Sequence, residues 1–130
     1  MYRQKIVFEK PPLLDEIVKV FPWAAHPGVL FSFGPTLYNP SKIEMTPMLV
    51  AHEAVHGERQ EVFPTDSVDG RIWKWWTMYM NSPTFRLEEE VLAHKAEIAE
   101  AKNWLSRHAR RGYIVQVAQR LASPLYGNMV

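Results

Sequence analysis

The chain contains no cysteine. That absence excludes disulfide bonds, thiol catalysis and zinc sites built from thiolates, and it fits a reducing compartment. An excess of charge of one sign is missing too, because 15 basic residues stand against 14 acidic ones, for a formal net charge of +1. A molecule with so small a net charge has no overall field that would recruit nucleic acid or an anionic membrane surface.

Long apolar runs are missing as well. No uncharged stretch approaches the roughly 18 residues that a membrane-spanning helix requires. Residues 1–20 contain no apolar segment long enough for the core of a signal peptide. We therefore expect no membrane span and a protein that stays in the cytoplasm in which it is synthesised.

The apolar residues that are present, 47% of 130, suffice for the core of one globular domain over residues 1–130. Proline after Thr46 and after Ser82 marks the start of two helices, and Gly112 is a stop signal for the second. Hydrophobic periodicity predicts short strands at 4–9, 29–33 and 36–39 and helices at 13–20, 47–61, 71–81, 83–110 and 113–122. The expected fold class is α+β, mostly helical, with a small N-terminal β-sheet.

The run H-E-A-V-H at 52–56 lies within the predicted helix 47–61. Residues four apart on a helix have side chains about 5–6 Å apart, so the imidazoles of His52 and His56 can bind one ion. Glu53 is rotated by about 100° from His52 and can reach a water molecule on the open side of that ion. This H-E-x-x-H pattern predicts a zinc site with two histidine ligands and Glu53 as the general base.

The alternative is a pair of exposed histidines that share this spacing by chance. Four apolar residues, Met48, Leu49, Ala51 and Val55, lie on the same side of the predicted helix as His52. The histidine pair therefore borders a buried face, and we favour the metal site.

A hydrolytic zinc site needs a third protein ligand besides two histidines. The metzincin pattern requires glycine and histidine where this chain has Arg59 and Val62, and the deformylase pattern requires a cysteine, so both are excluded. The remaining candidates are the glutamates and His94 of the segment 85–105, together with Asp66, Asp69 or another acid.

The apolar stripe of the helix 83–110 distinguishes among three consecutive glutamates. This stripe consists of Leu87, Val91, Ile98, Ala101 and Leu105. Glu90 lies about 60° from its centre, Glu88 about 100° and Glu89 about 160°, so Glu90 is favoured as the inward-pointing ligand. Glu88 and Glu89 are explained by the attraction of acids to a helix N-terminus. His94, one turn further, stays open as an alternative ligand or as a group that orients a ligand.

Hydrolysis at such a site also needs a hydrogen-bond donor for the oxyanion that develops on the substrate. A tyrosine hydroxyl or an imidazole N–H can serve as this donor. Tyr79 and Tyr113 are candidates, as are His94 and Tyr38, and the sequence does not choose among them.

Two further clusters favour structural roles. The tryptophans at positions 73, 75 and 76 are expected mostly to fill the core, with a substrate-side aromatic wall as the alternative. A basic cluster near the predicted C-terminus of the helix 83–110 is explained by the helix dipole, so nucleic acid is not expected as a partner. This basic cluster comprises Arg107, His108, Arg110 and Arg111.

The run at 52–56 and a later glutamate in the E-x-x-A setting Glu90-Val91-Leu92-Ala93 resemble a gluzincin metallopeptidase. More narrowly, the segments TLYNPSKIEMTPMLVAHEAVHGERQ and SPTFRLEEEVLAHKAE resemble small zincin-like proteins encoded by bacteriophages. The resemblance covers about residues 28–100. It implies a minimal zincin-like domain with the small sheet above the helix 47–61, located in the cytoplasm of a bacterial host.

This resemblance implies His52, His56 and Glu90 as ligands of Zn²⁺, Glu53 as the base and a peptide or protein as substrate. It also implies an edge strand that is free to pair with an extended peptide. The chain departs from thermolysin-type enzymes at His94, where those enzymes have an aspartate that orients a ligand histidine.

The function that follows is zinc-dependent hydrolysis of peptide bonds. One alternative is a non-catalytic zinc-bearing structural or interaction protein of phage origin. Another is an interaction module without a metal. The sequence leaves the substrate and the oligomeric state open.

Overall fold

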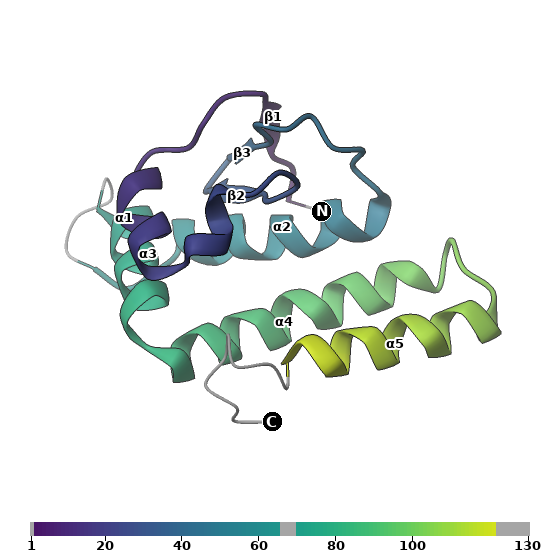
Figure 1. Cartoon of the computed structure of the whole chain (residues 1–130). Helices are drawn as coiled ribbons and strands as arrows, with labels where there is room; N and C mark the ends of the chain where they lie inside the picture. Colours follow the sequence, from purple (N-terminus) through teal and green to yellow (C-terminus); the bar gives the residue numbers. More distant parts are fainter. Residues whose placement is uncertain (1, 66–69, 122–130) are drawn as a thin grey trace.

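The computed structural model describes residues 2–65 and 70–121 (Figure 1). The elements are β1 (Lys5–Val7), α1 (Leu14–Val20), the 3₁₀ helix η1 (Pro22–Ala25), β2 (Phe31–Phe33), β3 (Thr36–Tyr38), α2 (Pro47–Glu61), α3 (Arg71–Asn81), α4 (Pro83–Ala101) and α5 (Arg107–Leu121). This mostly helical α+β arrangement confirms the expected fold class. Among the described helices, none combines the length and apolar composition needed to cross a membrane.

The three strands form a small sheet in the order β1-β3-β2. Strands β2 and β3 are an antiparallel hairpin, and β1 pairs in parallel with β3. The hairpin turns at Gly34 and Pro35, where Gly34 has a φ of +55°, in the left-handed region that favours glycine. The sheet lies on α2, as expected (Figure 1).

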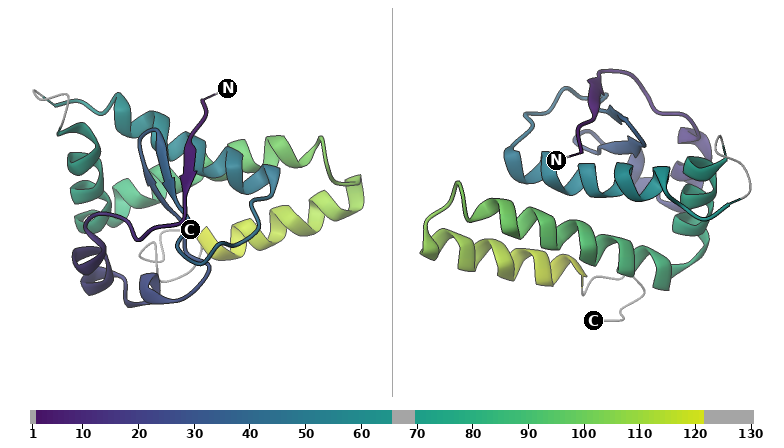
Figure 2. Two further views of the ribbon diagram at one scale, coloured as in Figure 1. Left: turned by 90° about the horizontal axis from the view of Figure 1, so that it is seen from above. Right: turned by 180° about the vertical axis from the view of Figure 1, so that it is seen from behind.

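Helix α2 begins where the Thr46-Pro47 pair predicts. The Thr46 hydroxyl oxygen accepts a hydrogen bond from the backbone N–H of Leu49 at 3.2 Å, and Pro47 occupies the start of the helix. The helix lies between the sheet on one side and α4 on the other (Figures 1 and 2). Side chains on two sides of α2 are therefore covered, and the histidines of the motif are buried.

The hydrophobic core packs α3 against α1, η1 and β2. Its buried members are Ile17, Phe21, Ala24, Phe31, Phe33, Trp75, Trp76 and Tyr79. Trp75 and Trp76 fill the core as expected, whereas Trp73 is 45% exposed. The indole N–H of Trp76 also donates to the backbone oxygen of Ser32 at 3.0 Å, which ties α3 to β2.

The long helix predicted for 83–110 is two helices. Helix α4 ends at Ala101, the chain turns, and α5 returns antiparallel alongside α4 (Figure 2). The Ser106 hydroxyl oxygen caps the new helix by accepting a hydrogen bond from the backbone N–H of Ala109 at 3.2 Å. The predicted stop at Gly112 is wrong, because this residue lies inside α5.

This break also changes the interpretation of the basic cluster at 107–111. The four basic residues occupy the first turns of α5 and not the C-terminus of a longer helix. Cations at a helix N-terminus interact unfavourably with the dipole, so the proposed dipole explanation is wrong.

A further correction concerns Glu89, which was expected to point away from the interior. Glu89 is only 2% exposed. Its carboxylate accepts hydrogen bonds from Arg59 Nε at 2.8 and 2.9 Å and from Trp75 Nε1 at 2.7 Å. The reason is that α4 packs against α2, α3 and α5, so more than one of its faces is covered.

Candidate metal centre

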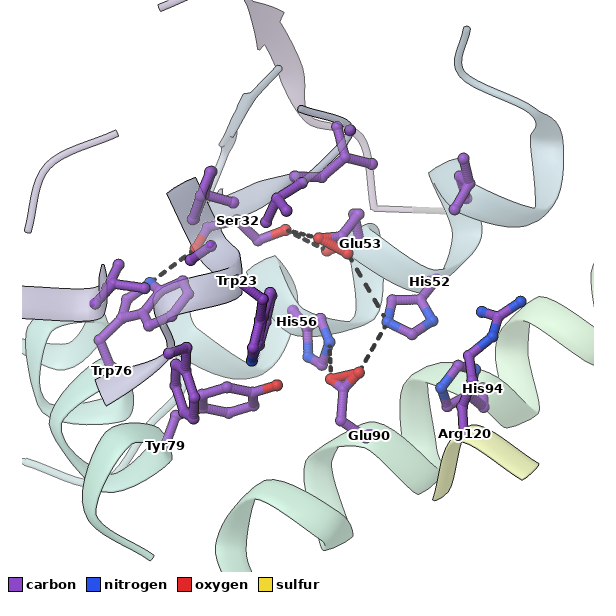
Figure 3. A pocket seen from close by; sticks show the side chains of 18 of the residues that line it. Trp23, Ser32, His52, Glu53, His56, Trp76, Tyr79, Glu90, His94 and Arg120 are labelled. Atoms are coloured by element: carbon purple, nitrogen blue, oxygen red, sulfur yellow. Dashed lines mark hydrogen bonds and ion pairs between the residues drawn. The ribbon is translucent and has the colours of Figure 1, made fainter. Parts of the chain in front are cut away.

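The neighbouring helices α2 and α4 bring two histidines and one glutamate together (Figure 3). His52 and His56 lie one turn apart on α2, with ring centroids 4.9 Å apart. His52 Nε2 is 3.2 Å from Glu90 Oε1, and His56 Nε2 is 2.5 Å from Glu90 Oε2. All three residues are buried. The favoured third acid is thus the one that faces both imidazoles.

These donor atoms fit a zinc ion by chemistry and by spacing. Two imidazole nitrogens and a carboxylate oxygen are a ligand set found in catalytic zinc sites. Ligand atoms about 2.0–2.1 Å from a tetrahedral ion lie roughly 3.3 Å apart, close to the separation between His52 and Glu90. The shorter contact between His56 and Glu90 is a direct ion-pair contact, and these two atoms would have to move apart by less than about 1 Å.

Glu53 lies beside the histidines and is held from the sheet. The Ser32 hydroxyl of β2 lies 3.0 Å from the Glu53 backbone oxygen and 3.4 Å from its Oε1. The other carboxylate oxygen is 3.9 Å from His52 Nε2. Burial raises the pKa of Glu53, against the opposing charges of His52 and His56. A buried carboxylate of this kind is suited to accept a proton and to return it.

Glu97, which the sequence interpretation missed, orients one of the candidate ligands. Its Oε1 lies 2.7 Å from His52 Nδ1 and 2.8 Å from His94 Nδ1, and its Oε2 accepts a hydrogen bond from the Tyr113 hydroxyl. The hydrogen bond from Nδ1 directs Nε2 of His52 at Glu90, where it can bind a metal once its own proton has left. Glu97 thus contacts His52 from a position other than that of the aspartate of thermolysin-type enzymes, which is His94 in this chain.

A signal for Glu97 was present in the sequence. Seven residues are almost two helical turns, so Glu97 lies about 20° around α4 from Glu90 and on the same face. His56 has no equivalent support, because its Nδ1 is buried without a hydrogen-bond partner among the described residues.

The charges of the cluster balance one another. Burial alone would lower the pKa of His52, but hydrogen bonds with Glu90 and Glu97 outweigh it and raise that pKa well above its usual value. Burial would raise the pKa of Glu90, yet His56 and His52 hold it well below its usual value. The pKa of Glu97 is lowered too, because its three hydrogen-bond donors outweigh burial. The raised pKa of His52 favours a proton on its ring, where a metal ion would compete with that proton.

The other candidate ligands have different positions. His94 shares Glu97 with His52, and the rings of the two histidines are 4.6 Å apart. Donor atoms of His52, His94 and Glu97 form a second group within 4.8 Å that could hold an ion, besides the group of His52, Glu53 and His56. We prefer a third combination, in which His52 and His56 bind the ion together with Glu90. Glu53 then adjoins the ion without having to serve as a ligand. Asp66 and Asp69 lie outside the described residues.

A cavity of about 390 Å³ opens beside this centre. Tyr79 lines it, together with His52, Glu53, His56 and Glu90 (Figure 3). Tyr79 is therefore the tyrosine that we retain as a candidate oxyanion donor. In the part of the chain that the structure describes, Tyr38 and Tyr113 do not line the cavity, and Tyr113 supports Glu97 instead.

The outer edge of β2 was expected to be free, but side chains occupy it. The Ser32 backbone oxygen accepts hydrogen bonds from Gln60 Nε2 at 2.8 Å and from Trp76 Nε1 at 3.0 Å. The Gly34 backbone N–H donates to Gln60 Oε1 at 2.6 Å. A peptide cannot pair with the strand at these groups while the bonds are in place. The expectation of an edge strand open to peptide is therefore wrong at this end of β2.

The resemblance to gluzincins stays a prediction, and it depends on the residues of this centre. The H-E-x-x-H run and Glu90 adjoin one another, and Glu53 lies beside them at a cavity. Comparison of the chain with protein-family models, with curated proteins and with solved structures finds no match.

Proposed function

We propose that the protein is a zinc-dependent peptidase in which His52, His56 and Glu90 hold the metal. The observation that carries this proposal is the meeting of both imidazoles with Glu90 at a buried point that borders a cavity. The position of Glu53 beside the histidines, and not between them and Glu90, gives it room to act on a water molecule. A site that only held a metal would not need this carboxylate.

Zinc in this site would polarise the substrate carbonyl and lower the pKa of a bound water toward about 7. Glu53 accepts the proton as the water attacks the carbonyl carbon and returns it to the leaving amine. Ser32 holds the Glu53 carboxylate in place. Tyr79 is the candidate donor to the oxygen that gains negative charge.

The first experiment distinguishes the role of Glu53 as the base from the role of the histidines as metal ligands. Glu53→Gln should bind zinc as the wild type does but lose kcat/KM for peptides by about 10²–10⁴-fold, because only proton transfer is removed. His56→Ala should lose the metal itself. Zinc content by elemental analysis of untagged protein, and turnover of a peptide library with and without o-phenanthroline, measure both. Glu58→Gln, an exposed residue of the same helix, is the matched control.

The outcomes divide the candidate functions. Full activity in Glu53→Gln would contradict the assigned base. Stoichiometric zinc without turnover in the wild type would favour the non-catalytic zinc-bearing structural or interaction protein. A wild type that binds no zinc would overturn the metal centre.

A further inference from the structure

The cavity beside the candidate metal centre differs in chemistry from one end to the other. One end is aromatic, with Trp23 from η1 and Trp76 and Tyr79 from α3. Arg120, from the last described turn of α5, lines the cavity on the side of His94 (Figure 3). Tyr79 and Arg120 lie on opposite sides of Glu90 in this view. A ligand that spans the cavity therefore passes the metal centre between two unlike ends.

The aromatic end is suited to a large apolar group. The volume of the whole cavity, about 390 Å³, lies in the lower part of the range of about 300–1,000 Å³ that is common for ligand pockets. Phe21 and Phe31 add further apolar walls. Trp23 is 41% exposed, although it belongs to the lining. An aromatic side chain that enters beside Trp23 would cover apolar surface that water now reaches.

The opposite end carries the positive charge of Arg120. The lining contains three carboxylates, those of Glu53, Glu90 and Glu97, and within the described residues each of them contacts a histidine of the centre. Arg120 is the one lysine or arginine among the described lining residues, and no ion pair between described residues involves it. A guanidinium in such a position can bind a ligand carboxylate through two parallel hydrogen bonds.

We infer that the substrate is a peptide that places a large apolar side chain beside Trp23, Trp76 and Tyr79 and a carboxylate against Arg120. The carboxylate is either the C-terminal one or the side chain of Asp or Glu, since both offer the same two oxygens. This inference rests on the proposed function, because it assigns the scissile amide to the space between the two ends. It names the substrate class that the cavity selects.

Binding, not turnover, tests this inference, so that it can fail separately from the proposed function. The protein is Glu53→Gln, full length and zinc-loaded, which should bind peptides without cleaving them. The probes are acetylated peptides with Phe followed by one to three Gly, made with a free C-terminus or a C-terminal amide. A third series keeps the amide and replaces the last Gly by Asp. Calorimetry or tryptophan fluorescence gives each Kd.

The best free acid should bind at least about tenfold more tightly than its amide, as expected for a charge-assisted pair. If Arg120 binds a side-chain carboxylate, the peptides that end in an Asp amide should bind as tightly as the best free acid. Replacing Phe by Ala should weaken binding by about tenfold or more. Arg120→Gln should abolish the preference for the acid and leave the affinity for the amide unchanged. Arg111→Gln, exposed on the same helix and outside the lining, is the matched control.

Equal affinities for all acids and amides, or no binding of any probe, would overturn the inference. So would loss of the preference in Arg111→Gln, which would indicate a general charge effect. Cleavage of peptides by the wild type without this selectivity would contradict the inference and leave the proposed function intact. Selective binding of these peptides without cleavage by the wild type would support the binding preference and contradict the proposed peptidase function.

Discussion

Glu97 connects the candidate metal centre to the rest of the molecule through hydrogen bonds. It is only 1% exposed and accepts from His52 on α2, from His94 on α4 and from Tyr113 on α5. A carboxylate behind a ligand imidazole fixes its orientation and raises its basicity. The geometry of His52 at the metal should therefore depend on a residue that does not touch the metal.

Glu97→Gln should lower the affinity for zinc by about 10–100-fold, because the amide can still accept a hydrogen bond but no longer provides the negative charge. Competition with a chromophoric chelator measures the affinity directly. Glu88→Gln, exposed on the same helix, should leave it unchanged. Equal zinc affinity in the Glu97 and Glu88 variants would show that Glu97 does not orient a ligand.

The protonation of His52 gives a second prediction for a single residue. Its pKa lies well above the usual value in the metal-free protein, so His52 carries a proton at pH 7. A metal can bind Nε2 only after that proton leaves, so zinc binding at pH 7 should release a proton. The release should fall as the pH rises through the His52 pKa, and the apparent affinity should rise over the same range.

Calorimetric titration with zinc in buffers of different ionisation enthalpy measures this release. The observed enthalpy should vary linearly with the buffer enthalpy at pH 7, with a slope that approaches zero at higher pH. Glu88→Gln, an exposed residue of α4 that still leaves every ligand in place, is the control and should release the same proton. An enthalpy that is independent of the buffer at pH 7 would contradict the raised pKa.

At the scale of helices and strands, the sequence predicted what depends on local signals. The Thr46-Pro47 pair gave the start of α2, and the angle of Glu90 to one apolar stripe gave its inward direction. Periodicity detects one stripe, whereas α4 packs on three helices, so Glu89 was assigned to solvent and Glu97 was overlooked. The support that Ser32 and Tyr113 give depends on contacts between distant segments, which no local pattern encodes.

Gly57 permits the close approach of the sheet to α2. A Cβ at this position would meet the Gly34 backbone oxygen, the Gln4 amide nitrogen and, at 3.1 Å, the Tyr2 ring. Gly57→Ala should lower the free energy of unfolding by about 1–3 kcal/mol, because the backbone of the hairpin has to move. The same movement would displace Ser32 from Glu53 and should reduce activity. Urea denaturation and peptide turnover measure the two effects.

Gly112→Ala is the matched control for this prediction. Gly112 lies inside α5, and a Cβ there meets nothing within 4 Å. Because alanine favours the helix, this variant should raise the free energy of unfolding by about 0.5–1 kcal/mol. A loss of stability in both variants alike would point to a general effect of added side chains, and not to the approach of the hairpin.

At the scale of the whole molecule, the candidate metal centre lies where three layers meet: the sheet, α2, and the pair formed by α4 and α5 (Figures 1 and 2). Ser32 reaches it from the sheet, the histidines from α2, and Glu90 and Glu97 from α4. The aromatic core lies mainly around α3, so charged groups fill much of the contact between α2 and α4. Burying such groups is costly unless they are well paired.

A metal ion bound by both helices should therefore stabilise the fold as a whole. A ligand that binds only the folded state at 100 times its Kd adds about 2.7 kcal/mol to the free energy of unfolding. For a domain of this size the melting temperature should rise by on the order of 10 °C. Calorimetry of protein first stripped with a chelator, then with zinc restored, measures this shift.

His56→Ala should melt at the same temperature with and without zinc, whereas Glu58→Gln should respond as the wild type does. If zinc raised the melting temperature of His56→Ala as much as that of the wild type, the stabilising ion would bind elsewhere, and α2 and α4 would be held together by their hydrogen bonds alone.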